Sequence, residues 1–145
     1  MKAYQKFGIA VLLVPSFVCI GVLAAQKTAA PAKAPQNTVE GLVRDVACPI
    51  QNKESTATRF NLECAKQCAK QGSPLVILTK DGTMYFPISE SMPDRDQRPQ
   101  LLPFVGKFVR ATGEVYERMG TQAIVIRKIE EDKSVPLTTD AFQPE

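Results

Sequence analysis

Histidine and tryptophan are both absent from this chain of 145 residues. Histidine is the side chain that most often serves as a general base or as a neutral metal ligand near neutral pH. Its absence excludes the Ser-His and Cys-His pairs that activate the nucleophile in many hydrolases. Any metal site would therefore have to be built from thiolates and carboxylates.

A large excess of one charge is missing as well. The formal net charge is +3, and removing residues 1–25 would take away two lysines and no acid, which leaves +1. The chain contains no tract of basic residues. Domains that bind nucleic acid carry a concentrated positive surface. We therefore expect no nucleic-acid partner.

The first 25 residues have the pattern of an export signal. Lys2 and Lys6 supply a positive start, an apolar run covers residues 7–25, and residues 22–24 (Val-Leu-Ala) end on a small residue, as signal peptidase prefers. The pattern predicts a cleaved signal peptide and a mature protein that is periplasmic or secreted. Because the run is close to the minimum length of a membrane span, an uncleaved anchor is the alternative. That anchor would be the protein's membrane contact.

Two further segments have the composition of unstructured chain. Residues 26–37 consist largely of Ala, Pro, Lys and Gln, and residues 133–145 have few apolar residues. Such stretches cannot bury enough apolar surface to offset the loss of chain entropy. We predict a disordered linker over 26–37, a folded domain over 38–132 and a disordered tail over 133–145.

Within the domain, five stretches have the residue types and periodicity of β-strands. The third stretch follows Asp81-Gly82, a typical hairpin turn, and the fourth follows a segment rich in proline. The expected strands cover residues 38–48, 74–80, 83–89, 107–118 and 121–131.

One helix is expected between the first two strands. Asn61 can cap its start, and Gly72 is suited to end it after residue 71. Phe60, Cys64 and Cys68 recur every four residues, which predicts that they form the face turned to the core. A second, shorter helical segment is expected around residues 100–105, between the third and fourth strands.

This order of elements predicts a mainly β fold. Five strands, with one helix between strands 1 and 2 and a helical turn between strands 3 and 4, match the plan of an OB-type barrel. Gly41 and Gly113 fall inside long strands, where a barrel bends sharply. An open five-stranded sheet covered by one helix is the alternative.

Three sequence motifs resemble those of a loosely defined group of small exported bacterial domains. They are "VEGLVRDVAC", "ECAKQCAKQGSPLVILTKDGTMYFP" and "FVGKFVRATGEVYERMGTQAIVIRKIE". Members of this group look like OB-type barrels and carry Asp-x-x-Cys after the first strand and Cys-x-x-x-Cys on the next helix, here Asp45 with Cys48 and Cys64 with Cys68. The resemblance covers about residues 39–130 and implies a fold, with no assigned activity. Members often have a histidine between the first two cysteines, and this chain has none.

The cysteines of the domain are Cys48, Cys64 and Cys68, while Cys19 lies inside the predicted signal peptide. Disulfides persist in exported proteins. A bond from Cys48 to either Cys64 or Cys68 would fasten the helix to the barrel. In the chain-entropy model, closing such a loop stabilises the fold by roughly 3 kcal/mol. One thiol would remain unpaired.

Two other interpretations of the cysteines stay open. Cys48, Cys64 and Cys68 could bind Cu or Zn, with Asp45 as a further ligand. Alternatively, Cys64 could be a redox-active thiol, because the N-terminus of the helix favours a thiolate there.

We therefore expect a small exported binding or accessory module, not an enzyme, with an OB-like barrel cross-linked by a disulfide and no cofactor. Its partner would be a small ligand or a protein of the cell envelope. A Cu- or Zn-binding envelope protein is the alternative, and a thiol–disulfide exchange protein is the third possibility.

Overall fold

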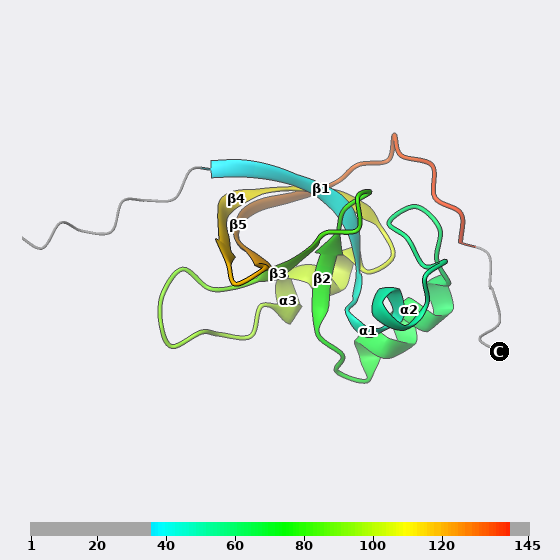
Figure 1. Cartoon of the computed structure of the whole chain (residues 1–145), viewed down its shortest axis with the longest axis horizontal. Coiled ribbons are helices and arrows are strands. Elements are labelled where there is room, and N and C mark those ends of the chain that lie inside the picture. Colours follow the sequence, from blue (N-terminus) through cyan, green and yellow to red (C-terminus); the bar gives the residue numbers. More distant parts are fainter. Residues whose placement is uncertain (1–35, 140–145) are drawn as a thin grey trace, which may run out of the picture. The chain divides into compact units, whose positions relative to one another are not determined.

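The computed structural model describes residues 36–139 (Figure 1). Its strands are β1 (Gln36–Asp45), β2 (Leu75–Leu78), β3 (Met84–Pro87), β4 (Phe108–Arg118) and β5 (Thr121–Glu131). Its helical segments are α1 (Ala47–Gln51), α2 (Leu62–Lys70), α3 (Arg98–Leu101) and the 3-10 turn η1 (Leu102–Phe104). Within these residues no helix is both long enough and apolar enough to span a bilayer. The predicted signal peptide, residues 26–35 of the predicted linker and residues 140–145 lie outside the described part.

The five strands close into a barrel in the order β1-β2-β3-β5-β4. β1 pairs antiparallel with both β2 and β4, which closes the cylinder, and β3 pairs parallel with β5. α1 and α2 lie between β1 and β2, and α3 and η1 lie between β3 and β4. The predicted mainly β, five-stranded OB-like barrel is therefore confirmed, and the open sheet is not what forms.

The inside of the barrel is filled by alternate side chains of the strands. Val39 and Val43 of β1 face Ile77, Val109 and Ile124 in one buried cluster. Successive side chains of a strand point to opposite faces, so every second residue of a wall strand belongs to this interior. Leu101 of α3 is fully buried in the same cluster.

A second apolar cluster lies on the outer face of the same strands. Leu42, Leu78 and Phe108 alternate with the interior residues and pack with Phe60 and Ala65 from the segment around α2. Figure 1 shows α1 and α2 together on this side of the barrel. The segment between β1 and β2 therefore covers apolar barrel wall that would otherwise face solvent.

Helix α2 begins and ends as the sequence predicts. The Asn61 side chain accepts a hydrogen bond of 2.9 Å from the backbone N–H of Cys64, which satisfies one of the unpaired donors of the first turn. Gly72, with φ of +93°, follows the last turn in the left-handed conformation that glycine adopts without strain.

The predicted core-facing stripe of α2 is wrong for the two cysteines. The buried residues of the helix are Ala65 and Ala69, while Cys64 and Cys68 are half-buried. Since each helical residue turns the chain by about 100°, the cysteines lie beside the buried stripe and not within it. Phe60, which precedes the helix, is fully buried as expected.

Both ends of the first strand differ from the predicted range of residues 38–48. β1 begins at Gln36, two residues inside the predicted linker, and pairs there with Glu114 of β4. It ends at Asp45, and the chain then turns into the short helix α1, where a strand to Cys48 was predicted. The Asp45 carboxylate accepts a hydrogen bond from the Cys48 N–H, a local side-chain interaction that competes with continued strand pairing.

The described start of the predicted disordered tail, residues 133–139, is folded back onto the domain. Thr138 accepts a hydrogen bond from Phe60 N–H and donates one to Thr58 C=O. Val135 and Leu137 pack against the outer apolar cluster. These two apolar side chains, weak as a pattern in sequence, meet an apolar surface assembled by β1, β2 and β4.

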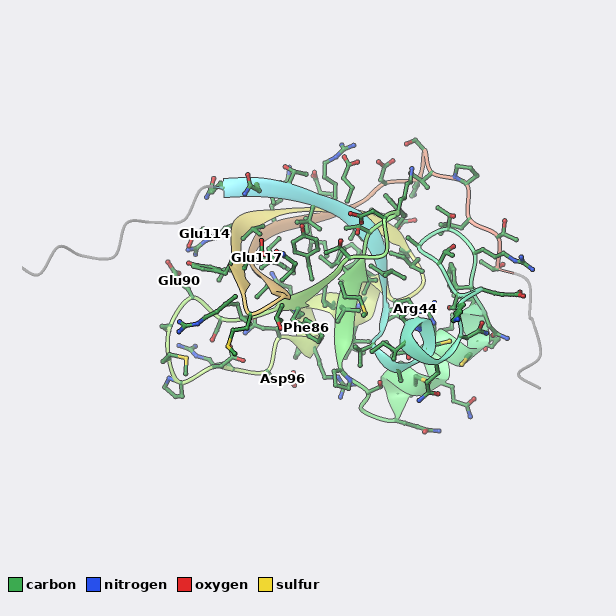
Figure 2. All side chains as sticks on the ribbon, in the orientation of Figure 1. Arg44, Phe86, Glu90, Asp96, Glu114 and Glu117 are labelled. Carbon is green, nitrogen blue, oxygen red and sulfur yellow. The ribbon has the colours of Figure 1, made fainter. Side chains whose placement is uncertain are left out.

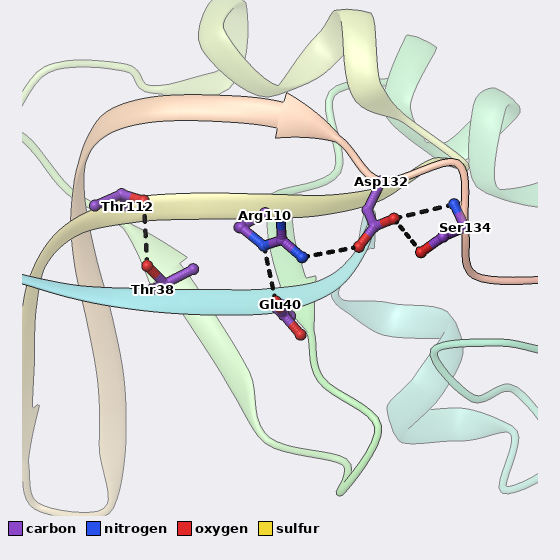
Figure 3. Close-up of polar contacts among 6 residues, drawn as sticks. All are labelled: Thr38, Glu40, Arg110, Thr112, Asp132 and Ser134. Carbon is purple, nitrogen blue, oxygen red and sulfur yellow. Dashed lines mark hydrogen bonds and ion pairs between the residues drawn. The ribbon is translucent and has the colours of Figure 1, made fainter.

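Polar side chains join β1 to β4 on an exposed part of the barrel (Figure 3). Arg110 donates to Glu40 at 2.8 Å and to Asp132 at 3.2 Å, and Thr38 lies 3.3 Å from Thr112 across the same strand pair. Hydrogen bonds from Ser134, followed in size by the charge of Arg110, lower the pKa of Asp132. These contacts fix the register of the two strands that close the barrel.

Gly41 and Gly113 are both positions where another backbone comes close. A Cβ on Gly113 would lie 2.0 Å from the carbonyl oxygen of Val125, and one on Gly41 would lie 2.4 Å from that of Leu78. The ladder between β4 and β5 shifts register between Thr112 and Gly113. Glycine is therefore required here for the tight curvature of the wall.

Replacing Gly113 by Ala should lower the free energy of unfolding by about 2 kcal/mol, because the new methyl group forces the β4 and β5 backbones apart. Chemical denaturation monitored by circular dichroism would measure the loss. Glu117→Ala, an exposed change in the same strand, is the matched control and should have little effect. Equal stability of the two variants would contradict the close approach.

Candidate thiol centre

Three cysteines come together on the side of the barrel covered by α1 and α2. Cys48 lies in α1, Cys64 in the first turn of α2 and Cys68 one turn later. All three are half-buried free thiols, and none lies at disulfide distance from another. We call Cys48, Cys64 and Cys68 the thiol centre.

Cys64 is the member of the thiol centre that interacts with both others. Burial, the largest cause, together with the charges of Cys48 and Cys68 and hydrogen bonds with them, raises the pKa of the Cys64 thiol to about 11. Cys64 therefore keeps its proton at neutral pH. Its S–H is placed to donate to a neighbouring sulfur.

The backbone N–H groups of Cys48 and Cys64 are each held by a side chain three residues earlier in the sequence. Asp45 Oδ1 accepts the N–H of Cys48 at 2.9 Å, and Asn61 Oδ1 accepts the N–H of Cys64 at 2.9 Å. Asn61 is the N-cap of α2, whereas Asp45 lies one residue before Val46, the N-cap of α1. The same local motif positions Cys48 and Cys64 independently.

A chain of donors leads from the barrel wall to the Cys48 sulfur. Nη1 of Arg44 contacts Ser55 Oγ, and Ser55 Oγ lies 3.7 Å from Cys48 Sγ. A guanidinium can only donate, so Ser55 must accept from Arg44. The Ser55 hydroxyl then has its own proton available for the sulfur of Cys48. Arg44 thereby polarises a hydroxyl directed at this thiol.

Arg44 is an unusual residue in this position because it is fully buried. Its Nη2 lies 3.4 Å from Asp45 Oδ2, and its guanidinium carbon lies 5.9 Å from the centre of the Phe60 ring. Its Nε is buried without a hydrogen-bond partner. Figure 2 shows Arg44 on the side of the barrel where α1 and α2 lie. A buried cation is costly unless the local structure compensates it, so the α1–α2 segment must fold around it.

Sequence reasoning missed Arg44 and Ser55. The signal for Arg44 is its place in "GLVRDVAC", where a strand that is apolar on both faces contains one cation beside Asp45. No sequence signal marks Ser55, which lies in an irregular loop and is buried only by tertiary packing.

The residues of the predicted metal site are partly engaged elsewhere. Asp45 is fully buried, and its two carboxylate oxygens face the Cys48 N–H and Arg44. Throughout residues 36–139, no group of three or more His, Cys, Asp or Glu side chains is arranged to hold a metal ion.

A separate shallow cavity of about 300 Å³ lies at the other end of α2. Phe86 and Asp96, both labelled in Figure 2, are among its lining residues. Asp96 accepts a hydrogen bond from the Arg98 N–H, and Arg98 Nη2 donates to the carbonyl of Ala69 at 2.5 Å. Asp94 accepts from Ser89, which lowers the Asp94 pKa. These hydrogen bonds hold the loop in place.

Comparisons of the chain with protein-family models, curated proteins and solved structures found no match.

The raised pKa of Cys64 predicts a pH dependence of the reduced protein. An ordinary thiol ionises near pH 9.0, whereas Cys64 in the folded state holds its proton to about pH 11. Between these values unfolding releases a proton, so the stability that Cys64 contributes is present below pH 9 and is lost as the pH rises toward 11. Thermal unfolding with reductant present, at several pH values in this range, should show this loss.

Cys64→Ser is the matched variant, because it removes the thiol and keeps a small polar side chain. All other titrating groups are the same in both proteins. Cys64→Ser should therefore lose less stability than the unchanged protein as the pH rises from 9 toward 11. Identical slopes of melting temperature against pH for the two proteins would contradict the perturbed thiol.

Proposed function

We propose that this protein is an exported, non-catalytic binding or accessory module whose OB-like barrel is cross-linked by a disulfide between Cys48 and Cys64. The observation that carries the proposal is the contact of the Cys64 thiol with Cys48, which brings together helices α1 and α2. The two sulfurs are not at bonding distance in the reduced protein, so their side chains must move toward each other to form the bond. Cys68 then remains as the unpaired thiol.

The choice of partner for Cys64 follows from geometry. Cys64 and Cys68 lie four residues apart on one helix, where their Cβ vectors run nearly parallel and resist closure of a bond. Cys48 comes from a different element and approaches Cys64 across the space between α1 and α2. The Cys48–Cys64 pair is therefore the less strained of the two bonds that Cys64 could make.

A bond would add to the packing of α2, in which Leu62 is the one large apolar side chain against the outer cluster. The buried residues of α2 are two alanines, Ala65 and Ala69, and small side chains bury little apolar surface. Closing the loop between Cys48 and Cys64 stabilises the native state by roughly 3 kcal/mol in the chain-entropy model. For a domain of this size that is a substantial part of the total stability.

Several features support a role in binding over catalysis. The chain has no histidine, and the carboxylates of Asp94 and Asp96 serve to hold their loop. The export pattern of residues 1–25 supports a site of action outside the cytosol, where a disulfide persists. The partner is then a small ligand or another protein of the cell envelope.

Binding of Cu or Zn is the second candidate function. It is favoured by one observation, the contact of the Cys64 thiol with the thiols of both Cys48 and Cys68. Soft thiolates select Cu(I) or Zn. Binding a metal through all three would require the side chains to move together from the positions they occupy.

Counting and mapping of thiols tests the cross-link. In the full chain carrying Cys19→Ser, isolated without reductant, we expect one free thiol. Trypsin cuts after Lys53, Arg59, Lys66 and Lys70, so each of the three cysteines falls in its own peptide. Mass spectrometry should find the Cys48 and Cys64 peptides joined and the Cys68 peptide free.

Stability measurements provide the second readout. Cys48→Ser should lower the melting temperature by roughly 10 °C, and Cys68→Ser, the control, should leave it nearly unchanged. Three free thiols with bound Cu or Zn in elemental analysis would favour the metal site. Three free thiols without metal, or a bond that includes Cys68, would contradict the proposal.

A further inference from the structure

The cavity at the end of α2 forms where two strands of the barrel wall separate. The ladder between β2 and β3 ends at the pair of Ile77 and Tyr85. Two steps further along this register, Leu75 would lie opposite Pro87, which has no N–H to donate to a neighbouring strand. Both residues instead line the cavity of about 300 Å³. The opening in the wall therefore follows from the sequence of β3.

The lining of this cavity is apolar where the strands supply it and charged where the loop before α3 supplies it. Phe86, Leu75 and two prolines contribute apolar surface, and residues 94–98 contribute two aspartates, two arginines and one glutamine. Phe86 on β3 and Asp96 on the loop are both labelled in Figure 2. Apolar lining with a few polar groups is the usual form of a site that binds a small organic group.

Both aspartates of the loop are already engaged with the chain. Asp94 Oδ1 accepts hydrogen bonds from the N–H and the hydroxyl of Ser89. Asp96 Oδ1 accepts one from the Arg98 N–H. These bonds fix the charged part of the lining before any ligand arrives, and a preformed site loses less entropy on binding than a mobile one.

Arg98 is the cation of the lining that lacks an acceptor. Its Nη2 donates to the carbonyl of Ala69 at 2.5 Å, which holds the guanidinium at the end of α2. Its Nε is buried without a hydrogen-bond partner, and its Nη1 lies beside Gly72, where a Cβ would be 3.4 Å from it. Within residues 36–139, neither Arg98 nor Arg95 forms an ion pair with a carboxylate. The unfilled buried group of the cavity is therefore a positively charged donor.

We propose that this cavity binds an organic acid, with its carboxylate on the guanidinium of Arg98 and its apolar part on Phe86 and Pro87. A planar guanidinium binds a carboxylate through paired, charge-assisted hydrogen bonds. Arg95, in the same lining, adds a second positive charge. The carboxylate supplies the acceptor that the described chain does not give to Arg98.

The acid carries a single negative charge. Asp94 and Asp96 belong to the same lining, so they repel the second charge of a ligand such as a phosphate monoester. A free small acid and the C-terminus of a polypeptide present the same chemistry here, which is a carboxylate next to an apolar group.

This inference rests on the proposed binding function and names the class of ligand. The lining of the cavity contains no cysteine. Binding of an acid and formation of the Cys48–Cys64 bond are therefore measured separately, and either can fail while the other stands.

Titration of the isotope-labelled full chain with phenylpropionate, followed by NMR, tests the site. We expect saturable shifts of the amide signals of Gly72, Phe86 and Arg98. Phenylpropionamide, the neutral analogue, and phenyl phosphate, which carries two charges, should both bind more weakly.

A peptide that ends in phenylalanine with a free carboxylate distinguishes the two sources of the acid. Its amidated form is the control and should bind more weakly than the free form. Tighter binding of the free peptide than of phenylpropionate identifies a protein C-terminus as the ligand. Equal or weaker binding identifies a small acid.

Variants of the arginines test the contact itself. Arg98→Gln should weaken binding of phenylpropionate by about tenfold, as expected for the loss of a hydrogen bond between charged groups. Arg95→Gln, at a more exposed position, should weaken it by about threefold. Arg118→Gln removes the same charge from an exposed position at the end of β4 and should leave binding unchanged. Circular dichroism melts check the folding of each variant; should Arg98→Gln fail to fold, Arg95→Gln and the amide probe decide.

Three results would overturn the inference. They are binding of phenylpropionamide or phenyl phosphate at least as tight as that of phenylpropionate, shifts confined to residues outside the cavity, and unchanged affinity in both Arg98→Gln and Arg95→Gln. Absence of binding, together with a mapped Cys48–Cys64 bond, would refute the organic-acid site and leave the cross-link standing. Binding as expected, with three free thiols in the isolated protein, would refute the cross-link alone.

Discussion

The closure of β1 onto both β2 and β4 is the constraint on which the rest of the structure depends. Because β1 has a neighbouring strand on each side, it has no free edge. Its residues therefore point alternately into the barrel interior and onto the outer face of the wall. Val39 and Val43 fill the barrel, while Leu42 and Arg44 project from the outer wall. The outer wall then requires a cover, and the chain between β1 and β2 supplies it.

The buried guanidinium of Arg44 determines which polar side chains of the α1–α2 segment lie beneath it on the barrel wall. A cation on the outer wall, enclosed by α1, α2 and the loop between them, needs acceptors, and it finds Asp45 and Ser55. Ser55 links the guanidinium to Cys48, and Cys48 adjoins Cys64. The same packing that protects the apolar wall therefore places the thiols of Cys48 and Cys64 together. The cross-link that we propose would join these two thiols.

Local patterns predicted most of the fold. Strand alternation, the Asp81-Gly82 turn, the Asn61 cap and Gly72 all depend on residues close in sequence, and the structure confirms each of them. The same reasoning failed where distant surfaces decide. Residues 133–139 lie against the domain because Val135 and Leu137 meet a surface built from three strands, a contact that no local pattern encodes. A fourfold spacing on α2 is compatible with more than one buried stripe, and the wall of the barrel selects Ala65 and Ala69 over the cysteines.

The sequence by itself determined the class of fold and which side chains are available for chemistry. With no histidine, three cysteines in the domain and five strand patterns, it allows thiol chemistry on a small barrel. Tertiary structure alone decided which thiols meet and what surrounds them. The contacts from Arg44 to Ser55 and from Cys48 to Cys64 cross an irregular loop whose path is set by packing on the barrel wall, and no periodic pattern encodes such a path.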